Sequence, residues 1–71
     1  MAADFEVRKD NQGQWYWTFQ AENSKTIARS SESYHNRSDC LHSIKLVKDI
    51  GPAAIVYDMT TNPISRVTTL P

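Results

Sequence analysis

The residues best suited to chemistry are one cysteine and two histidines near the middle of the chain. Cys40 lies close in sequence to His35 and His42, and a thiol near a helix N-terminus has a lowered pKa that favours the nucleophilic thiolate. However, His42 is only two positions from Cys40, so the two side chains point to different sides of a helix. Cys40 shares its spacing with apolar residues instead, and we expect it to be a small buried side chain.

A metal site could combine Asp39 with the same two histidines. These three residues lack the specific ligand spacing of known metal sites, and exposed polar side chains at the start of a helix explain them equally well. A phosphate-binding loop needs clustered glycines, but the chain holds only Gly13 and Gly51. We therefore assign no catalytic and no metal-binding residue, and we expect a protein that is not an enzyme and uses no cofactor.

The segment "GQWYWTFQ", residues 13 to 20, alternates between large apolar and other side chains. This period of two predicts a strand that turns Trp15, Trp17 and Phe19 into the core. Tyr16 and Thr18 then lie on the outer face, with Arg8 of the preceding strand opposite Tyr16. A base or a sugar could stack on this outer face, but one outward ring is fewer than a working stacking platform presents. Weak nucleic-acid or small-ligand binding on this outer face, at Arg8, Tyr16 and Thr18, is therefore the alternative function.

Charge and length restrict the possible partners. Eight Lys and Arg balance eight Asp and Glu without a basic stripe, which disfavours a nucleic-acid partner. No apolar run approaches the roughly 18 residues of a membrane span, and a single cysteine fits a reducing compartment, so we expect a cytoplasmic protein. A domain of 71 residues buries too little surface to be very stable alone, and without a disulfide, oligomerisation is the obvious support.

Three strands are expected before the one helix. "FEVRKD" and "WYWTFQ" form a hairpin closed by a three-residue loop with Gly13 in the left-handed conformation, which sets Phe5 opposite Phe19. "AENSKTIARSS" supplies a third strand after a turn in which Asn23 is best able to take positive φ. A two-residue turn would set Ala28 opposite Phe19 and a three-residue loop would set Ile27 there; we slightly prefer the first.

The segment "SDCLHSIKLVKDIGP" predicts the helix. Ser38 is the expected N-cap, and Gly51 with Pro52 ends the helix. The spacing of i, i+4, i+7 places one apolar stripe against the sheet, with two leucines on its flanks. The stripe consists of Cys40, Ile44 and Val47, and the flanking residues are Leu41 and Leu46.

Together these segments resemble a known family. "FEVRKDNQGQWYWTFQAENSKTIARSSESY" followed by "SDCLHSIKLVKDIGPAA" is similar to the repeat of the small YegP-like domains, although the usual Asn-Gly turn is Asn23-Ser24 here. The resemblance implies an α+β fold with a β3-α-β unit, an antiparallel sheet packed on one helix, and no assigned activity. It also implies tandem repeats or a homodimer with exchanged C-terminal strands. Residues 1–59 form the expected domain, and residues 60–71 form a tail of uncertain order.

The exchange is also expected from the segment "AAIVYDM". Its large apolar side chains are too many to leave in water, and Pro52 favours an extended departure from the helix. We therefore predict a homodimer in which this strand pairs with the partner's sheet, in a protein interaction or structural role whose other partner the sequence does not identify. The residues of this dimer strand are Ile55, Val56, Tyr57 and Met59.

Overall fold

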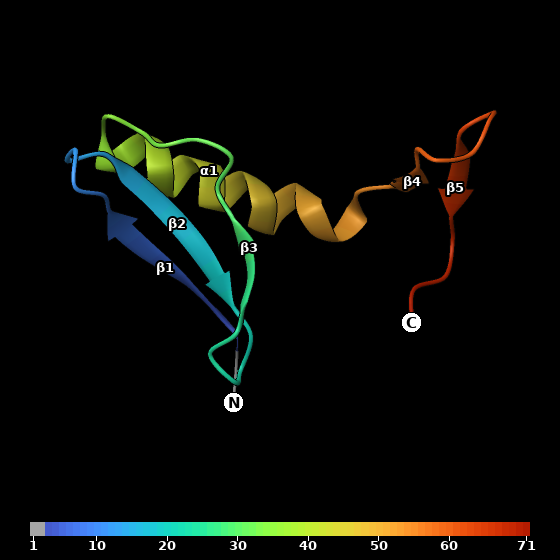
Figure 1. The fold of residues 1–71 in the computed structure, drawn as a ribbon, viewed down its shortest axis with the longest axis horizontal. Helices are drawn as coiled ribbons and strands as arrows, with labels where there is room; N and C mark the ends of the chain where they lie inside the picture. The colour runs from blue at the N-terminus through green and yellow to red at the C-terminus, as the bar shows by residue number, and fades with distance from the viewer. Residues whose placement is uncertain (1–2) are drawn as a thin grey trace.

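A computed structural model describes residues 3–71 and divides them between one long helix and two antiparallel sheets (Figure 1). The first sheet has the strand order β1-β2-β3, and the second contains β4 and β5. The elements in chain order are β1 (Asp4–Lys9), β2 (Trp15–Gln20), β3 (Thr26–Arg29), α1 (Arg37–Ile50), the 3-10 helix η1 (Gly51–Ala53), β4 (Val56–Asp58) and β5 (Ser65–Val67).

The hairpin of β1 and β2 forms as the sequence predicts. Phe5 lies opposite Phe19, and the loop has Gly13 at φ 79°. The amide of Asp10 donates to the carbonyl of Gln14 (2.8 Å), and the Asp10 carboxylate accepts from the Gln14 amide (2.9 Å). The left-handed position is one that glycine adopts without steric cost, and this allows the loop to close in three residues.

The turn before β3 corrects two details of the prediction. Ser24, not Asn23, has the positive φ (64°), because the Asn23 side chain accepts a bond from the Lys25 amide (3.2 Å) and leaves the next residue to reverse the chain. The loop therefore has three residues, with the Ala21 amide bonded to the Lys25 carbonyl (2.8 Å). The preferred register is nevertheless correct: a bulge in the pairing at Phe19 brings Ala28 opposite it.

Helix α1 begins two residues earlier than predicted. Asn36, in an extended conformation (φ −110°, ψ 139°), is the N-cap in place of Ser38. Asn36 is as favourable a cap residue as Ser38, and its carbonyl already accepts from the Cys40 amide (3.3 Å). The helix ends before Gly51, where the chain continues into η1.

The core lies between the first half of α1 and the face of β1 and β2. Trp17 is 7% exposed and Cys40 is 0% exposed, and these are the buried hydrophobic residues of the described chain. Phe5 packs edge-on against Trp17 (5.3 Å between ring centroids). Trp15 and Phe19, also predicted as core, are half-buried. The structure thus has a small core for its length.

Strands β4 and β5 form a hairpin that stands apart from the first sheet (Figure 1). In the register Val56 pairs with Val67 and Tyr57 with Arg66. Among the described elements neither strand contacts β1, β2, β3 or α1. The segment that the sequence assigns to a tail, residues 60–71, therefore contains β5.

The overall dimensions reflect this separation. The radius of gyration is 14.8 Å, whereas a compact domain of this length would have about 11 Å. Within residues 3–71, the helices are too short and too polar to cross a membrane.

Candidate functional site

The thiol considered for chemistry lies in the core. Cys40 is completely buried between α1 and the sheet, and burial raises its pKa, with a smaller opposing effect from the charge of Arg37. A buried thiol with a raised pKa is a poor nucleophile at neutral pH. The position fits the apolar role that the helix spacing predicts.

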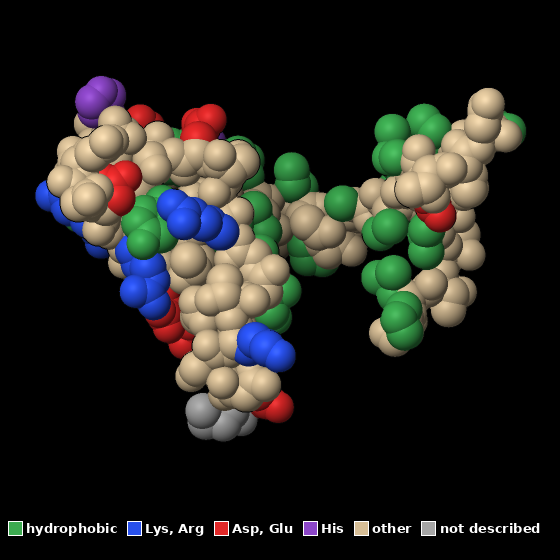
Figure 2. Space-filling model, in the orientation of Figure 1, with side chains coloured by type: hydrophobic (Ala, Val, Ile, Leu, Met, Phe, Trp, Pro, Cys, Tyr) green, Lys and Arg blue, Asp and Glu red, His purple; other side chains and the backbone are tan. Residues whose placement is uncertain are grey.

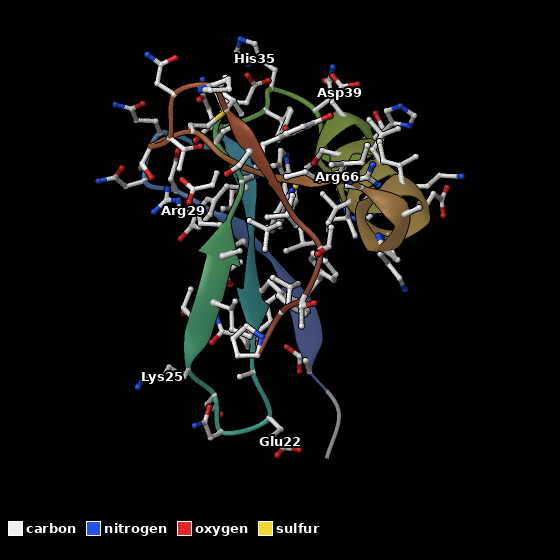
Figure 3. The ribbon with its side chains drawn as sticks, turned by 90° about the vertical axis from the view of Figure 1, so that its right-hand side faces the viewer. Glu22, Lys25, Arg29, His35, Asp39 and Arg66 are labelled. Atoms are coloured by element: carbon white, nitrogen blue, oxygen red, sulfur yellow. The ribbon has the colours of Figure 1, made fainter. Side chains whose placement is uncertain are left out.

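The three residues considered for metal binding lie on the surface. His35 and Asp39 point outward near the start of α1 (Figure 3), and His42 is also exposed. Residues 3–71 contain no group of three Cys, His, Asp or Glu side chains arranged to hold a metal ion. The pattern in the sequence is thus not matched by a ligand cluster in space.

The outer face of the first sheet brings together the three residues of the alternative site. Arg8 lies opposite Tyr16, as predicted, and its Nε donates to the Thr18 hydroxyl (3.3 Å). Arg8 also forms an ion pair with Glu6, which offsets its charge. Thr18 itself is buried.

Sequence reasoning missed Arg29 on this face. Its guanidinium lies 4.4 Å from the centroid of the Tyr16 ring, and its charge also acts on Asp10. The preferred register already contained this information. When Ala28 lies opposite Phe19, Arg29 lies opposite Thr18 and therefore beside Tyr16. One face of the outward ring is therefore already occupied by a cation.

The apolar side chains that the sequence assigns to the dimer strand are exposed in and beside the hairpin of β4 and β5. Tyr57 is 55% and Met59 69% exposed, and Ile55 and Val56 are exposed as well. β5 occupies one edge of β4, and within the described chain the other edge of β4 has no strand beside it. The hairpin thus combines apolar side chains with an open hydrogen-bonding edge.

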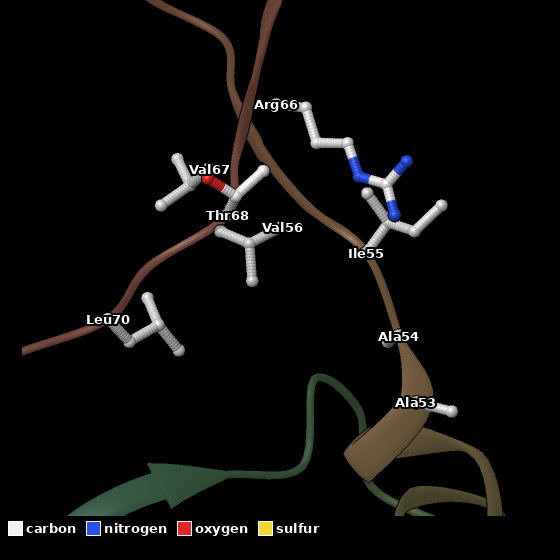
Figure 4. A pocket seen from close by; sticks show the side chains of 8 residues that line it. All are labelled: Ala53, Ala54, Ile55, Val56, Arg66, Val67, Thr68 and Leu70. Carbon is white, nitrogen blue, oxygen red and sulfur yellow. The ribbon is translucent and has the colours of Figure 1, made fainter.

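A shallow hollow of about 280 Å³ lies where the hairpin meets η1 (Figure 4). Arg66 and Ile55 project to one side of it, and Val56, Val67 and Leu70 project to the other. Arg66 is its one charged lining residue. The wall formed by Val56, Val67 and Leu70 is apolar.

The second half of α1 presents a second apolar surface, a strip of three side chains. Leu46, Val47 and Ile50 lie within one face of the helix, and all three are exposed, Ile50 by 63%. Val47 was expected to face the sheet, and this is corrected: it is 42% exposed, and the second half of α1 continues beyond the sheet (Figure 1). Figure 2 shows hydrophobic side chains on the side of the body that faces the hairpin and on the side of the hairpin that faces the body.

A family model described as "Domain of unknown function (DUF1508)" matches residues 10–58. The chain belongs to the DUF1508 family. This membership confirms the family resemblance found in the sequence. The match ends at the last residue of β4, so β5 lies beyond the part of the chain that the DUF1508 model describes.

Curated relatives of this DUF1508 chain are UPF0339 proteins. One from Agrobacterium fabrum is 39% identical over 57 residues, which are 80% of this chain and 90% of that protein. One from Neisseria meningitidis serogroup B is 33% identical over 55 residues, 78% of this chain and 96% of that protein. Nearly the whole of each relative is thus matched, and about a fifth of this chain is not.

A solved structure has the same fold. The NMR solution structure of a protein from Haloferax volcanii matches with a TM-score of 0.73 and 30% identity, over 79% of this chain and 93% of that chain. The predicted α+β class, with antiparallel strands and one helix, is confirmed.

Proposed function

We propose that this DUF1508 chain is a non-enzymatic homodimeric module, with a protein interaction or structural role, in which each β4 strand adds to the partner's sheet. One observation carries the proposal. The β4–β5 hairpin has no contact with the strands of the first sheet or with α1, within the described chain, although it exposes Tyr57 and Met59. Apolar side chains so placed require a covering surface.

The surface area supports a second copy of the chain as this cover. The chain exposes 5865 Å², whereas a folded monomer of 8.1 kDa exposes about 4,500 Å². If each protomer buried the excess of about 1,400 Å², a dimer would bury about 2,800 Å² in total, which falls in the range of obligate dimers, roughly 2,000 to 5,000 Å².

The backbone after α1 favours exchange over folding back. Pro52 lies in η1, and Ala54 is extended (φ −68°, ψ 141°), so the chain leaves the helix in the direction away from its own sheet. Within residues 3–71, β1 and β3 have no strand on their outer edges in the first sheet, and β1 is the longer strand. Mutual addition of β4 to such an edge closes a two-fold assembly and covers edges that would otherwise promote aggregation.

The proposal that the protein is not an enzyme is supported by the environment of its thiol and imidazole groups. The thiol of Cys40 is buried with a raised pKa, and the histidines considered with it are exposed and separate. The backbone and the apolar side chains of the hairpin remain as the groups available for recognition.

The mass of the full chain across a dilution series tests the proposal. Light scattering should give twice the chain mass at high micromolar concentration and a decrease on dilution, and the unfolding midpoint should rise with concentration. Exchange is distinguished from side-by-side contact by mixing isotope-labelled chains with unlabelled chains that carry a spin label at Thr60→Cys. Broadening should appear in the labelled chain's first sheet. A full chain that stays monomeric at high micromolar concentration would contradict the proposal.

A second candidate is weak binding of a single-stranded nucleic acid or a small ligand at Arg8, Tyr16 and Thr18. Two guanidinium groups, those of Arg8 and Arg29, lie on the face that carries the Tyr16 ring. A chemical-shift titration with single-stranded DNA and RNA at low salt tests it. Shifts clustered at these residues and lost with added salt would favour this candidate, and unchanged spectra would exclude it.

A further inference from the structure

We propose that β5 and the residues after it form a second contact of the dimer, in which the wall of Val56, Val67 and Leu70 packs on the Leu46, Val47 and Ile50 strip of the partner's α1. This inference rests on the proposed function and adds to it a docking surface to which Val67 and Leu70, beyond the DUF1508 match, contribute. The occupant of the hollow beside η1 is therefore a second copy of this chain.

The two faces of the hairpin indicate which side would meet a helix. Tyr57 pairs with Arg66 on one face, and Val56 pairs with Val67 on the other. The first sheet has the same division, because Tyr16 is stacked by Arg29 on its outer face and Trp17 packs toward α1 on its inner face. When β4 joins such a sheet, matching the faces places Tyr57 and Arg66 outside and the valine pair on the helix side.

The apolar wall and the helix strip have the exposure that such a contact needs. Leu70 is 66% exposed and Ile50 is 63% exposed, so each has apolar surface to lose on docking. The hollow in Figure 4 is open, and its apolar wall offers space for a projecting aliphatic side chain. Burial of both surfaces would account for part of the excess area of the single chain.

A chain cannot supply this contact to itself in the conformation observed. Within residues 3–71, β4 and β5 make no contact with α1, and open space separates the hairpin from the body (Figure 2). The exchange that moves β4 onto the partner carries β5 with it, because the two strands are paired along their length. The partner's α1 is thus the helix that the apolar wall approaches.

This contact would be an addition of this chain to the family fold. The family match ends at Asp58, and β5 begins at Ser65. Val67 and Leu70 therefore lie beyond the part that the chain shares with the family model. The exchanged strand β4 lies inside the shared part, so the two contacts can be tested separately.

The test measures the dimer dissociation constant of the full-length chain and of point variants by sedimentation. Val67→Asp and Leu70→Asp should each raise the dissociation constant at least tenfold, since a carboxylate would be buried against the strip. Ile50→Asp should have the same effect from the other side of the contact. Thr69→Asp is the matched control, because Thr69 is exposed and does not line the hollow, and it should change the constant less than about twofold, as surface substitutions usually do.

A cross-link shows which helix is contacted and does not depend on the charge variants. Chains carrying Leu70→Cys are mixed with chains carrying Ile50→Cys and oxidised. A disulfide-linked dimer containing one chain of each kind is the expected product. Circular dichroism of each variant checks that the first sheet and α1 are still folded.

The outcomes separate this inference from the proposed function. A full chain that is monomeric at all concentrations overturns both. A dimeric chain whose dissociation constant is unchanged by Val67→Asp and Leu70→Asp, and which forms no mixed cross-link, overturns the second contact and leaves the exchange of β4 intact.

Discussion

The indole nitrogen of Trp17 donates a hydrogen bond of 2.8 Å to the hydroxyl of Ser43 and so joins β2 to α1. The Ser43 hydroxyl in turn donates to the carbonyl of Cys40, one turn earlier in the helix (2.7 Å). The most buried aromatic ring and the completely buried thiol are thus linked through one side chain. This short chain of bonds joins the helix to the sheet at the two buried hydrophobic residues of the described chain.

The first prediction concerns this contact. Trp17→Ala should lower the free energy of unfolding by about 3 to 5 kcal/mol, because it empties a buried site of a large aromatic side chain. Tyr16→Ala, on the other face of the same strand, should cost much less because Tyr16 is only half-buried. Urea unfolding at one fixed protein concentration measures both. Similar losses for the two variants would contradict the assignment of the inner and outer faces.

The second prediction uses the turn before β3. Ser24 has a φ of 64°, where a side chain is strained and glycine is not. Ser24→Gly should therefore raise the free energy of unfolding by up to about 1 kcal/mol, whereas Asn23→Gly should not, because it removes the side chain that bonds the Lys25 amide. Thermal unfolding of the two variants at equal concentration gives the comparison. A loss of stability in Ser24→Gly would show that the backbone at Ser24 is not strained.

Much of the fold could be predicted from the sequence because its signals are local. The alternation around Trp17 defines the two faces of β2, and the three-residue spacing around Gly13 sets the register of the first hairpin. The Ala28 register was correct for a different reason from the one expected: a bulge compensated for the longer loop. Such compensation depends on pairing between strands and cannot be read from a turn alone.

The remaining features depend on contacts that a local pattern does not contain. β5 has three residues, among threonines and prolines, and its only signal is the weak alternation of "ISRV". Val47 matched the helical stripe, but the sheet does not extend far enough to cover it. The exposure of the hairpin and of the strip on α1 emerges only when the elements are placed in space.

The third prediction is a loss of stability in acid that depends on Asp10. Hydrogen bonds from the backbone amides of Gln14 and Gln12 hold the pKa of this carboxyl below its ordinary value of 3.8. The unfolded chain then binds a proton more readily than the native one, so stability present above pH 4 declines as the pH falls through the native pKa. Asp10→Asn should remove this part of the pH dependence below about pH 4. An unchanged acid slope in the variant would show that the loop does not bind the carboxylate.

The last prediction concerns the buried thiol at the opposite end of the pH scale. Burial raises the pKa of Cys40 above its ordinary value of 9.0, so the native protein keeps the proton while the unfolded chain begins to lose it. Stability should therefore be unaffected by this group below pH 8 and should decrease as the pH rises above about 9. Cys40→Ala should lose this alkaline decrease, although it also leaves a small cavity that lowers stability at every pH. The comparison is made between slopes of unfolding free energy against pH, from denaturant titrations at matched protein concentration. Labelling of native Cys40 by a thiol reagent should also be slow at pH 8 and fast in denaturant. Rapid labelling of the native protein would show that the thiol is accessible and would reopen the question of a reactive cysteine.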